Sequence, residues 1–131
     1  MSQKIEKATK HGGLLHVKEF RCIRHVSDLA ALRAFYDEYF DWPITDQWDT
    51  GIMYDTGAVI FELIQKDNVD MPNDASCISI SIPDVWALFE KMKDKVKIVF
   101  PLRDNSWGDT SFQMQDPEGY KITLFTPTKI K

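Results

Sequence analysis

The sequence feature that most constrains the fold is an internal repeat. Three residues of the first half recur 56 positions later, where Asp28, Ala31 and Leu32 match Asp84, Ala87 and Leu88. A later pair, Asp55 and Leu63, matches Asp116 and Leu124 at an offset of 61 positions. The two offsets differ by only five positions. Both halves also follow the same order of a strand, an Asp-capped helix and three strands. The sequence therefore predicts two copies of one supersecondary unit.

The predicted copies span about 14–66 and 76–127, within one domain of residues 14–131. The first copy has a strand at 14–26, a helix from Asp28 to Trp42 and Pro43, and strands at 44–48, 50–54 and 58–64. The second has a strand at 76–82, a helix from Asp84 to about 95, and strands at 96–100, 111–115 and 120–125. Residues 65–75 are polar with a central proline, and they connect the copies. We expect residues 1–13, which are polar without an apolar period, to form a flexible arm.

Composition limits the classes of partner. A chain of 131 residues with 44% hydrophobic residues fits one domain with its own core. The formal net charge of −4 argues against nucleic acid, because phosphate binding needs a basic face. No apolar run reaches the roughly 18 residues that span a bilayer, and the first residues lack the apolar centre of a signal peptide. We therefore expect a cytoplasmic protein without membrane or nucleic-acid partners.

Alternation along the strand at 76–82 predicts which face each residue occupies. Ile78, Ile80 and Ile82 share one face, while Cys77, Ser79 and Ser81 share the other. A twisted mixed sheet with helices on one side leaves the opposite side concave. The isoleucines are expected to face the helices, and the polar residues to line a ligand cup. The other cysteine, Cys22, falls on the helix side of its strand, so we expect no disulfide with Cys77.

With these elements in place, the chain resembles the vicinal oxygen chelate superfamily, which includes glyoxalases, bleomycin-resistance proteins and dioxygenases. The resemblance covers about 17–126, and its most specific parts are an Asp-Leu…Phe-Tyr helix at 28–36 and a DPxG turn at 116–119 followed by an alternating strand. The segments that carry it are RCIRHVSDLAALRAFYDEYFDWP, VIFELI, SISIPDVWALFEKM and WGDTSFQMQDPEGYKITLF. The resemblance implies an α+β fold in which two βαβββ modules form a curved mixed-sheet cup around one ligand. It also implies a homodimer.

Metal-dependent members of this family place four ligands in the cup. The resemblance maps those positions to Arg21, Glu62, Cys77 and Thr123. Only Glu62 is a standard ligand for such a site, because a guanidinium offers no lone pair and Thr is a poor donor. We therefore expect no metal and no other cofactor. Two readings of the vacant position remain: a charge-assisted pair of Arg21 with Glu62, or a ligand set in which His25 joins Glu62.

Aromatic residues mark the expected rim and wall of the cup. Trp107 lies in the polar segment 103–110, where it either stacks on a ligand or serves packing or a dimer contact. Phe125 shares a face with Thr123 and is a cup wall or an edge-packing residue. The remaining tryptophans are expected to pack, with Trp48 nearest the mouth of the pocket. Asp28 and Asp84 are expected to cap helices, since each directly precedes one.

The predicted function is binding of a small planar or cationic molecule in the cup without a metal. Its ligand-binding residues are predicted to be Arg21, His25, Glu62, Cys77, Trp107, Thr123 and Phe125. The alternative is an enzyme of the lyase, isomerase or dioxygenase kind that acts on a small oxygenated substrate. A scaffold domain with a filled cup is a third possibility. The sequence leaves open whether the chain has any catalytic activity.

Overall fold

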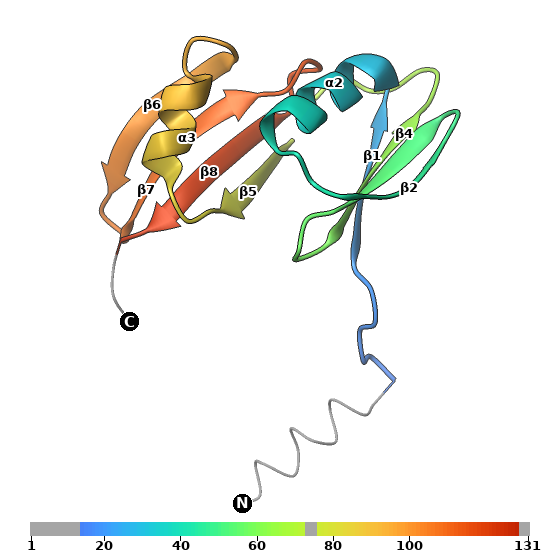
Figure 1. Cartoon of the computed structure of the whole chain (residues 1–131), viewed down its shortest axis with the longest axis horizontal. Helices are drawn as coiled ribbons and strands as arrows, with labels where there is room; N and C mark the ends of the chain where they lie inside the picture. Colours follow the sequence, from blue (N-terminus) through green and yellow to red (C-terminus); the bar gives the residue numbers. More distant parts are fainter. Residues whose placement is uncertain (1–13, 73–75, 129–131) are drawn as a thin grey trace, which may run out of the picture.

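Two modules with the same order of elements follow one another along the chain (Figure 1). The computed structural model describes residues 14–72 and 76–128, so the predicted arm at 1–13 lies outside the described residues. Module 1 contains β1 (Arg21–Val26), α2 (Leu29–Tyr39), β2 (Ile44–Trp48), β3 (Gly51–Asp55) and β4 (Ile60–Gln65). Module 2 contains β5 (Cys77–Ser81), α3 (Val85–Met92), β6 (Lys97–Asn105), β7 (Asp109–Gln115) and β8 (Lys121–Pro127). The predicted repeat and the α+β fold of two βαβββ modules are confirmed.

Each module builds one four-stranded mixed sheet. The strand orders are β1-β4-β3-β2 and β5-β8-β7-β6. The first and last strands of each module pair in parallel, and the other neighbours are antiparallel. A parallel pair needs a long crossover, and the helix of each module provides part of it. None of the helices in the described part of the chain is long and apolar enough to cross a membrane.

Both helices begin at the predicted N-caps. The Asp28 side chain accepts a hydrogen bond from the backbone N–H of Ala31 at 3.1 Å, and Asp84 accepts one from Ala87 at 3.0 Å. An Asp in this position satisfies a backbone donor that the helix itself leaves unpaired. The first helix ends at Tyr39, before Trp42 and Pro43, and Asp41 just beyond it adopts a positive φ of 51°. These observations confirm the capping roles of Asp28 and Asp84.

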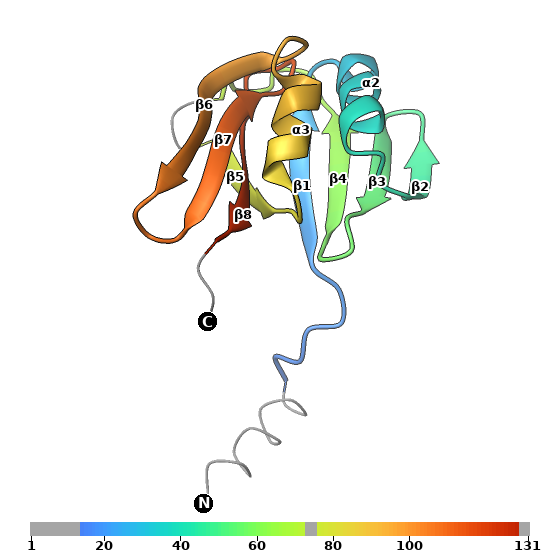
Figure 2. The ribbon, with the colours of Figure 1, turned by 60° about the vertical axis from the view of Figure 1, so that its left-hand side comes forward.

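The core lies between the helices and one face of each sheet (Figure 2). Its fully buried side chains come from both modules: Val26, Leu32, Tyr36, Ile52, Tyr54, Leu63, Val85, Met92, Phe112, Met114, Ile122 and Leu124. Fully burying one large apolar side chain contributes about 1.5–3 kcal/mol. Ile78, Ile80 and Ile82 pack against this core as predicted. Cys22 also packs against it whereas Cys77 is exposed, and both thiols are free.

We call the opposite side of each sheet its open face, because the helices do not cover it. Strand register arranges its side chains in rows that run across the sheet. The rows of module 1 are Arg21–Ile60–Asp55, Ile23–Glu62–Met53 and His25–Ile64–Gly51–Trp48. The rows of module 2 are Cys77–Lys121–Gln115–Lys97, Ser79–Thr123–Gln113–Phe100 and Ser81–Phe125–Ser111–Arg103. The indole of Trp48 packs over Gly51, and a Cβ at this position would force the indole to shift.

A buried polar cluster joins the two modules. Asp116, in the turn before β8, forms an ion pair with Arg24 of β1 and accepts a hydrogen bond at 2.9 Å from the Tyr36 hydroxyl. Its other carboxylate oxygen accepts the backbone N–H groups of Glu118 and Tyr120. The Arg24 guanidinium also lies 3.9 Å from the centroid of the Tyr120 ring. Every oxygen of this buried carboxylate therefore has a partner, which offsets its desolvation.

The same turn also reaches the start of the first helix. The Glu118 carboxylate accepts the backbone N–H groups of Ser27, at 3.0 Å, and of Asp28, at 2.8 Å. A carboxylate at a helix N-terminus is stabilised by the exposed N–H groups and the helix dipole. The DPEG turn of module 2 thus fixes the position of module 1 against it. The sequence predicted Asp116 only as a turn residue and did not indicate this contact.

Two predicted boundaries are wrong. The first strand begins at Arg21 rather than residue 14, because β4, its partner strand among the described residues, begins at Ile60. The Phe20 carbonyl still accepts the Ile60 N–H, and residues 14–19 leave the sheet (Figure 1). The predicted loop at 103–110 is mostly strand, since β6 continues to Asn105 and β7 begins at Asp109. Pro101 is tolerated inside β6 because β6 is an edge strand whose register shifts on both sides of Phe100.

Candidate functional site

The open face of module 2 holds a cavity of about 450 Å³. Three aromatic residues, one arginine and several polar side chains line it: Phe100, Trp107, Phe125, Arg103, Asp109, Ser79, Ser111, Gln113 and Thr123. Its size and its mixture of aromatic walls with a few polar groups are typical of small-molecule sites. The structure thus brings together three residues predicted for the ligand site: Trp107, Thr123 and Phe125.

Strand register supplies the floor of this cavity. Thr123 lies between Ser79 and Gln113 in one row, and Phe125 lies beside Ser111 in the next row. The Gln113 side-chain N–H donates to the Thr123 hydroxyl at 3.0 Å and contacts the Cys77 sulfur at 3.7 Å. Cys77 also lies 3.8 Å from the Thr123 hydroxyl. Cys77 is therefore part of the polar floor through its contacts, next to the residues that line the cavity.

The β6–β7 turn positions Trp107 at the rim. Its side chain is 65% exposed, and its indole N–H donates to Asp109 at 3.1 Å. The other Asp109 oxygen accepts a hydrogen bond from Asn105 at 2.7 Å. Gly108 has a φ of 105°, a conformation that favours glycine and allows the tight turn. An exposed indole held by a hydrogen bond can stack on a planar ligand without a large loss of side-chain entropy.

On the same rim Arg103 stacks on Phe100. The guanidinium carbon lies 3.7 Å from the centroid of the Phe100 ring, a cation–π geometry. Arg103 shares its row with Ser111 and Phe125, which places the charge beside the polar floor. Neither residue was predicted from the sequence, because the strand was expected to end at Phe100 and residues 103–110 to form a loop. The register shifts of β6 on both sides of Phe100 bring Phe100 and Arg103 to the same face, with Arg103 opposite Ser111.

Arg21 and Glu62 face each other on the open face of module 1. The closest guanidinium nitrogen lies 3.7 Å from the Glu62 carboxylate, close enough for an ion pair but too far for a hydrogen bond. Arg21 instead donates to Glu19 at 2.6 Å. The hydrogen bond and charge of Glu19 raise the pKa of the Arg21 guanidinium. The pair predicted from the sequence is present, but its charge-assisted hydrogen bond does not form.

Glu62 is therefore a buried carboxylate with an incomplete set of partners. The residue is 5% exposed, and one carboxylate oxygen has no hydrogen-bond partner among the described residues. Ile23 and Met53 flank it in its row across the sheet. A buried charged oxygen without a hydrogen bond is costly. Buried polar atoms without a hydrogen-bond partner are few in native proteins, so Glu62 is a candidate functional residue.

The four family metal positions do not form a metal site in this chain. Arg21 presents a cation to Glu62, while Cys77 and Thr123 contact each other in the other module. No group of three His, Cys, Asp or Glu side chains among residues 14–72 and 76–128 is placed to hold a metal ion. A catalytic zinc or iron needs three such ligands from the protein. The donor set therefore does not fit the metal of the family.

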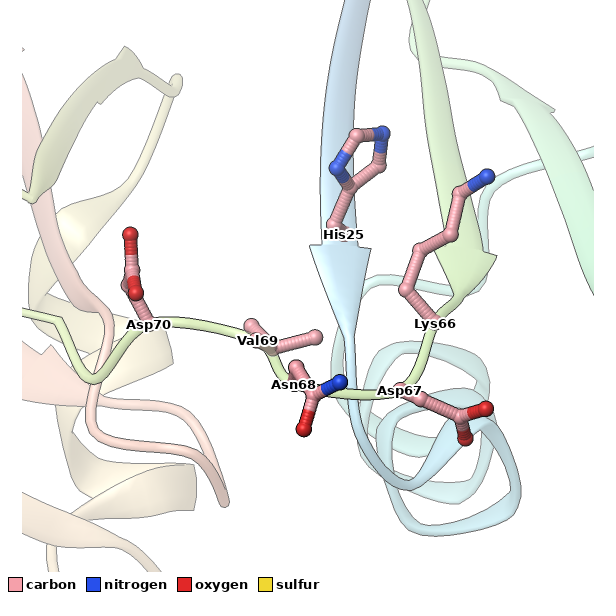
Figure 3. Close-up of a pocket in the computed structure, with 6 residues that line it drawn as sticks. All are labelled: His25, Lys66, Asp67, Asn68, Val69 and Asp70. Carbon is pink, nitrogen blue, oxygen red and sulfur yellow. The ribbon is translucent and has the colours of Figure 1, made fainter.

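His25 lies apart from the cavity of module 2. Together with residues 66–70 of the connection it lines a separate hollow of about 390 Å³ (Figure 3). Figure 3 shows His25, Lys66 and Asp70 projecting to one side of this segment, and Asp67 and Asn68 pointing away. In the sheet His25 pairs with Ile64, so it occupies the row next to that of Glu62. The predicted ligand residues thus fall into two groups, one on each open face, and His25 lies apart from both. The group of module 1 is Arg21 and Glu62, and that of module 2 is Cys77, Trp107, Thr123 and Phe125.

The geometry defines a class: a two-module α+β protein with an aromatic-rimmed cavity on the open face of one module. Comparison with known proteins agrees. Residues 13–124 match the model of the Glyoxalase/Bleomycin resistance protein/Dioxygenase superfamily. The chain belongs to this superfamily, as its sequence resemblance indicated. No curated protein gives a significant match to it.

Solved structures show the same fold at low sequence identity. A protein of unknown function from Agrobacterium tumefaciens is 19% identical with a TM-score of 0.73, over 84% of this chain and 94% of that chain. A glyoxalase/bleomycin resistance protein/dioxygenase from Nocardioides is 12% identical with a TM-score of 0.73, over 98% and 95%. A glyoxalase-related enzyme from Fulvimarina pelagi is 16% identical with a TM-score of 0.72, over 84% and 88%. At these identities the similarity establishes the fold alone.

Proposed function

We propose that the protein binds a small planar organic molecule in the cavity of module 2, without a metal. The observation that carries this proposal is the combination of Trp107, Phe100 and Phe125 with a hydroxyl- and amide-bearing floor. Aromatic walls give a planar ligand contact area, and a few polar groups fix its orientation. Binding without a metal is supported by Arg21, which stands where the family has a ligand and holds its charge near Glu62.

The test uses the tryptophan at the rim as a reporter. A panel of planar compounds is titrated into the protein while tryptophan fluorescence and the melting temperature are recorded. A true ligand quenches the fluorescence and raises the melting temperature with its concentration. In Trp107→Phe the quenching falls, whereas Trp86→Phe, on helix α3 outside the cavity, keeps it. Quenching that survives in Trp107→Phe and disappears in Trp86→Phe would place the ligand elsewhere and refute the proposal.

A second candidate function is an enzyme of this superfamily acting on a small oxygenated substrate. The observation in its favour is Glu62, whose buried oxygen without a hydrogen-bond partner among the described residues is available to act as a general base. Metal analysis of protein purified without chelator tests a metal-dependent form of this enzyme against the metal-free proposal. One equivalent of zinc, nickel, iron or manganese per chain, lost in Glu62→Ala, would overturn the metal-free proposal. Metal below about a tenth of an equivalent would support it.

We also propose that the protein forms a homodimer. Val17, Phe20 and Ile23 are each more than half exposed, and they follow one another along the segment that leads into β1. A run of exposed apolar side chains of this kind is typical of an interaction surface. Sedimentation analysis is expected to give the mass of two chains, and Phe20→Ser combined with Ile23→Ser to lower it toward one. Met71→Ser, an exposed apolar residue outside this segment, serves as the control.

A further inference from the structure

The two charged side chains that line the cavity of module 2 differ in whether other side chains already pair with them. Asp109 is the only carboxylate among the residues that line it, and both of its oxygens accept hydrogen bonds, from Asn105 and from Trp107. Arg103 is the only cation among them. No carboxylate in residues 14–72 or 76–128 lies within ion-pair distance of Arg103. The cavity therefore offers a ligand one positive charge that no carboxylate of the described residues neutralises.

The carboxylate next to Arg103 in sequence does not neutralise it either. Asp104 pairs with Thr110 in the sheet register, whereas Arg103 pairs with Ser111, so the two side chains leave opposite faces of β6. Asp104 accepts a hydrogen bond from the Thr110 hydroxyl at 2.6 Å. The acidic groups of module 1 at Asp37 and Asp46 are not among the residues that line the cavity either. The net charge of −4 describes the whole chain and therefore does not fix the charge of a ligand at this site.

The geometry of Arg103 suits recognition of a carboxylate. Its guanidinium plane is supported by the Phe100 ring, so the side chain is oriented before a ligand arrives. Stacking occupies a face of the guanidinium and leaves its N–H edge for hydrogen bonds. A carboxylate accepts two parallel N–H groups from such an edge, which a lysine does not provide. Ser111 and Phe125, in the same row, supply a hydroxyl and a ring beside the charge.

We propose that the ligand of this cavity is a planar organic acid, whose carboxylate pairs with Arg103 while its ring contacts Trp107 and Phe125. This inference rests on the proposed function and adds the charge of the ligand. It replaces the cationic option of the predicted ligand, because both oxygens of Asp109 accept hydrogen bonds from Asn105 and Trp107, whereas no carboxylate of the described residues pairs with Arg103. The polar floor of Ser79, Gln113 and Thr123 accommodates further oxygens on the acid.

Isothermal titration calorimetry with three naphthalene compounds tests the charge. Naphthoate is anionic, naphthylmethanol is neutral and naphthylmethylammonium is cationic, and all three share one ring system. We expect naphthoate to bind the wild-type protein more tightly than the ammonium compound. Arg103→Gln is expected to weaken naphthoate binding by roughly 10- to 100-fold, the range of a charged hydrogen-bonded contact. It is expected to change naphthylmethanol binding by less than about twofold, since that compound carries no charge.

Two control variants sharpen the result. Arg33→Gln removes the same charge from helix α2, outside the cavity, and is expected to leave naphthoate binding unchanged. Arg103→Lys keeps the charge but loses the planar edge, so it is expected to recover only part of the affinity. Unchanged naphthoate affinity in Arg103→Gln, or tighter binding of the ammonium compound than of naphthoate, would overturn the proposal of an acidic ligand. The proposal of a planar ligand would then still stand. Binding of none of the three compounds at millimolar concentration would overturn both.

Discussion

The two modules share one backbone plan but differ in the chemistry of their open faces. At equivalent positions of the first strand, module 1 carries Ile23 and His25 and module 2 carries Ser79 and Ser81. On the last strand Ile60, Glu62 and Ile64 correspond to Lys121, Thr123 and Phe125. At these positions module 1 presents three isoleucines, a histidine and a buried carboxylate, whereas module 2 presents three hydroxyls, a lysine and a ring. The two modules share the same rows of backbone positions, and the cavity with aromatic walls and a polar floor lies on the open face of module 2.

The turns before the last strands differ just as clearly. In module 2 Asp116 is buried and contacts Arg24 and Tyr36 of module 1. Glu118 of the same turn accepts the backbone N–H of Asp28. In module 1 the corresponding Asp55 is exposed, and its side chain accepts the backbone N–H of Gly57 within its own turn. The turn of module 1 therefore makes this contact only within itself, whereas the turn of module 2 joins the two modules. The junction fixes how module 1 lies beside the cavity.

The largest expected effect tests this difference between the turns. Asp116→Ala leaves Arg24 buried without its partner, and removing one member of a buried pair costs roughly 3–5 kcal/mol of unfolding free energy. Asp55→Ala is the matched control, and it is expected to cost less than about 1 kcal/mol because it removes one exposed hydrogen bond. Urea denaturation of both variants measures the two costs. Equal losses would show that the turns contribute alike and would contradict the asymmetry.

A second experiment sharpens the same comparison through pH. Burial, with the charge of Asp116 next, raises the pKa of Tyr36 well above its usual value of 10.0. The neutral hydroxyl is thus favoured in the folded state, so its stabilisation is complete below about pH 10 and is lost as the pH rises beyond it. Tyr36→Phe is expected to cost about 1.5–3 kcal/mol at pH 7, because the buried hydroxyl donates to the Asp116 carboxylate and accepts from the Arg24 guanidinium. That difference should shrink above about pH 10 in urea denaturation, whereas parallel stability curves would argue against this coupling.

What could be predicted from the sequence depended on the range of the interactions involved. The repeat and the helix starts at Asp28 and Asp84 are local features, because capping and side-chain alternation act within a few residues. The partner of Asp116 could not be predicted, since Arg24 lies 92 positions earlier and only the docking of the modules joins them. The DPEG sequence at Asp116 and the DTGA sequence at Asp55 each predict a turn, and neither indicates a partner in the other module.

The cavity was predicted in part for the same reason. Thr123 was expected from the ligand position that the family resemblance maps to it, Phe125 from sharing a strand face with Thr123, and Trp107 from its isolated place in a polar segment. Phe100 and Arg103 were missed because Pro101 indicates the end of a strand, and only the register shifts on edge strand β6 explain its tolerance. Residues 14–20 were wrongly predicted as strand, since a strand-like pattern forms a strand only where a partner strand exists.

The smallest expected effects compare equivalent positions on the two open faces. Glu62→Met is expected to raise the free energy of unfolding by about 1 kcal/mol, because it replaces a buried, incompletely bonded carboxylate between Ile23 and Met53 with an apolar side chain. Thr123→Val is expected to lower it by about 1 kcal/mol, because the Gln113 side-chain N–H loses its acceptor. Urea denaturation at neutral pH measures both. A loss of stability in both variants would mean that Glu62 is as well satisfied as Thr123. Opposite signs would mean that module 1 retains a carboxylate that lowers stability, as groups kept for function do.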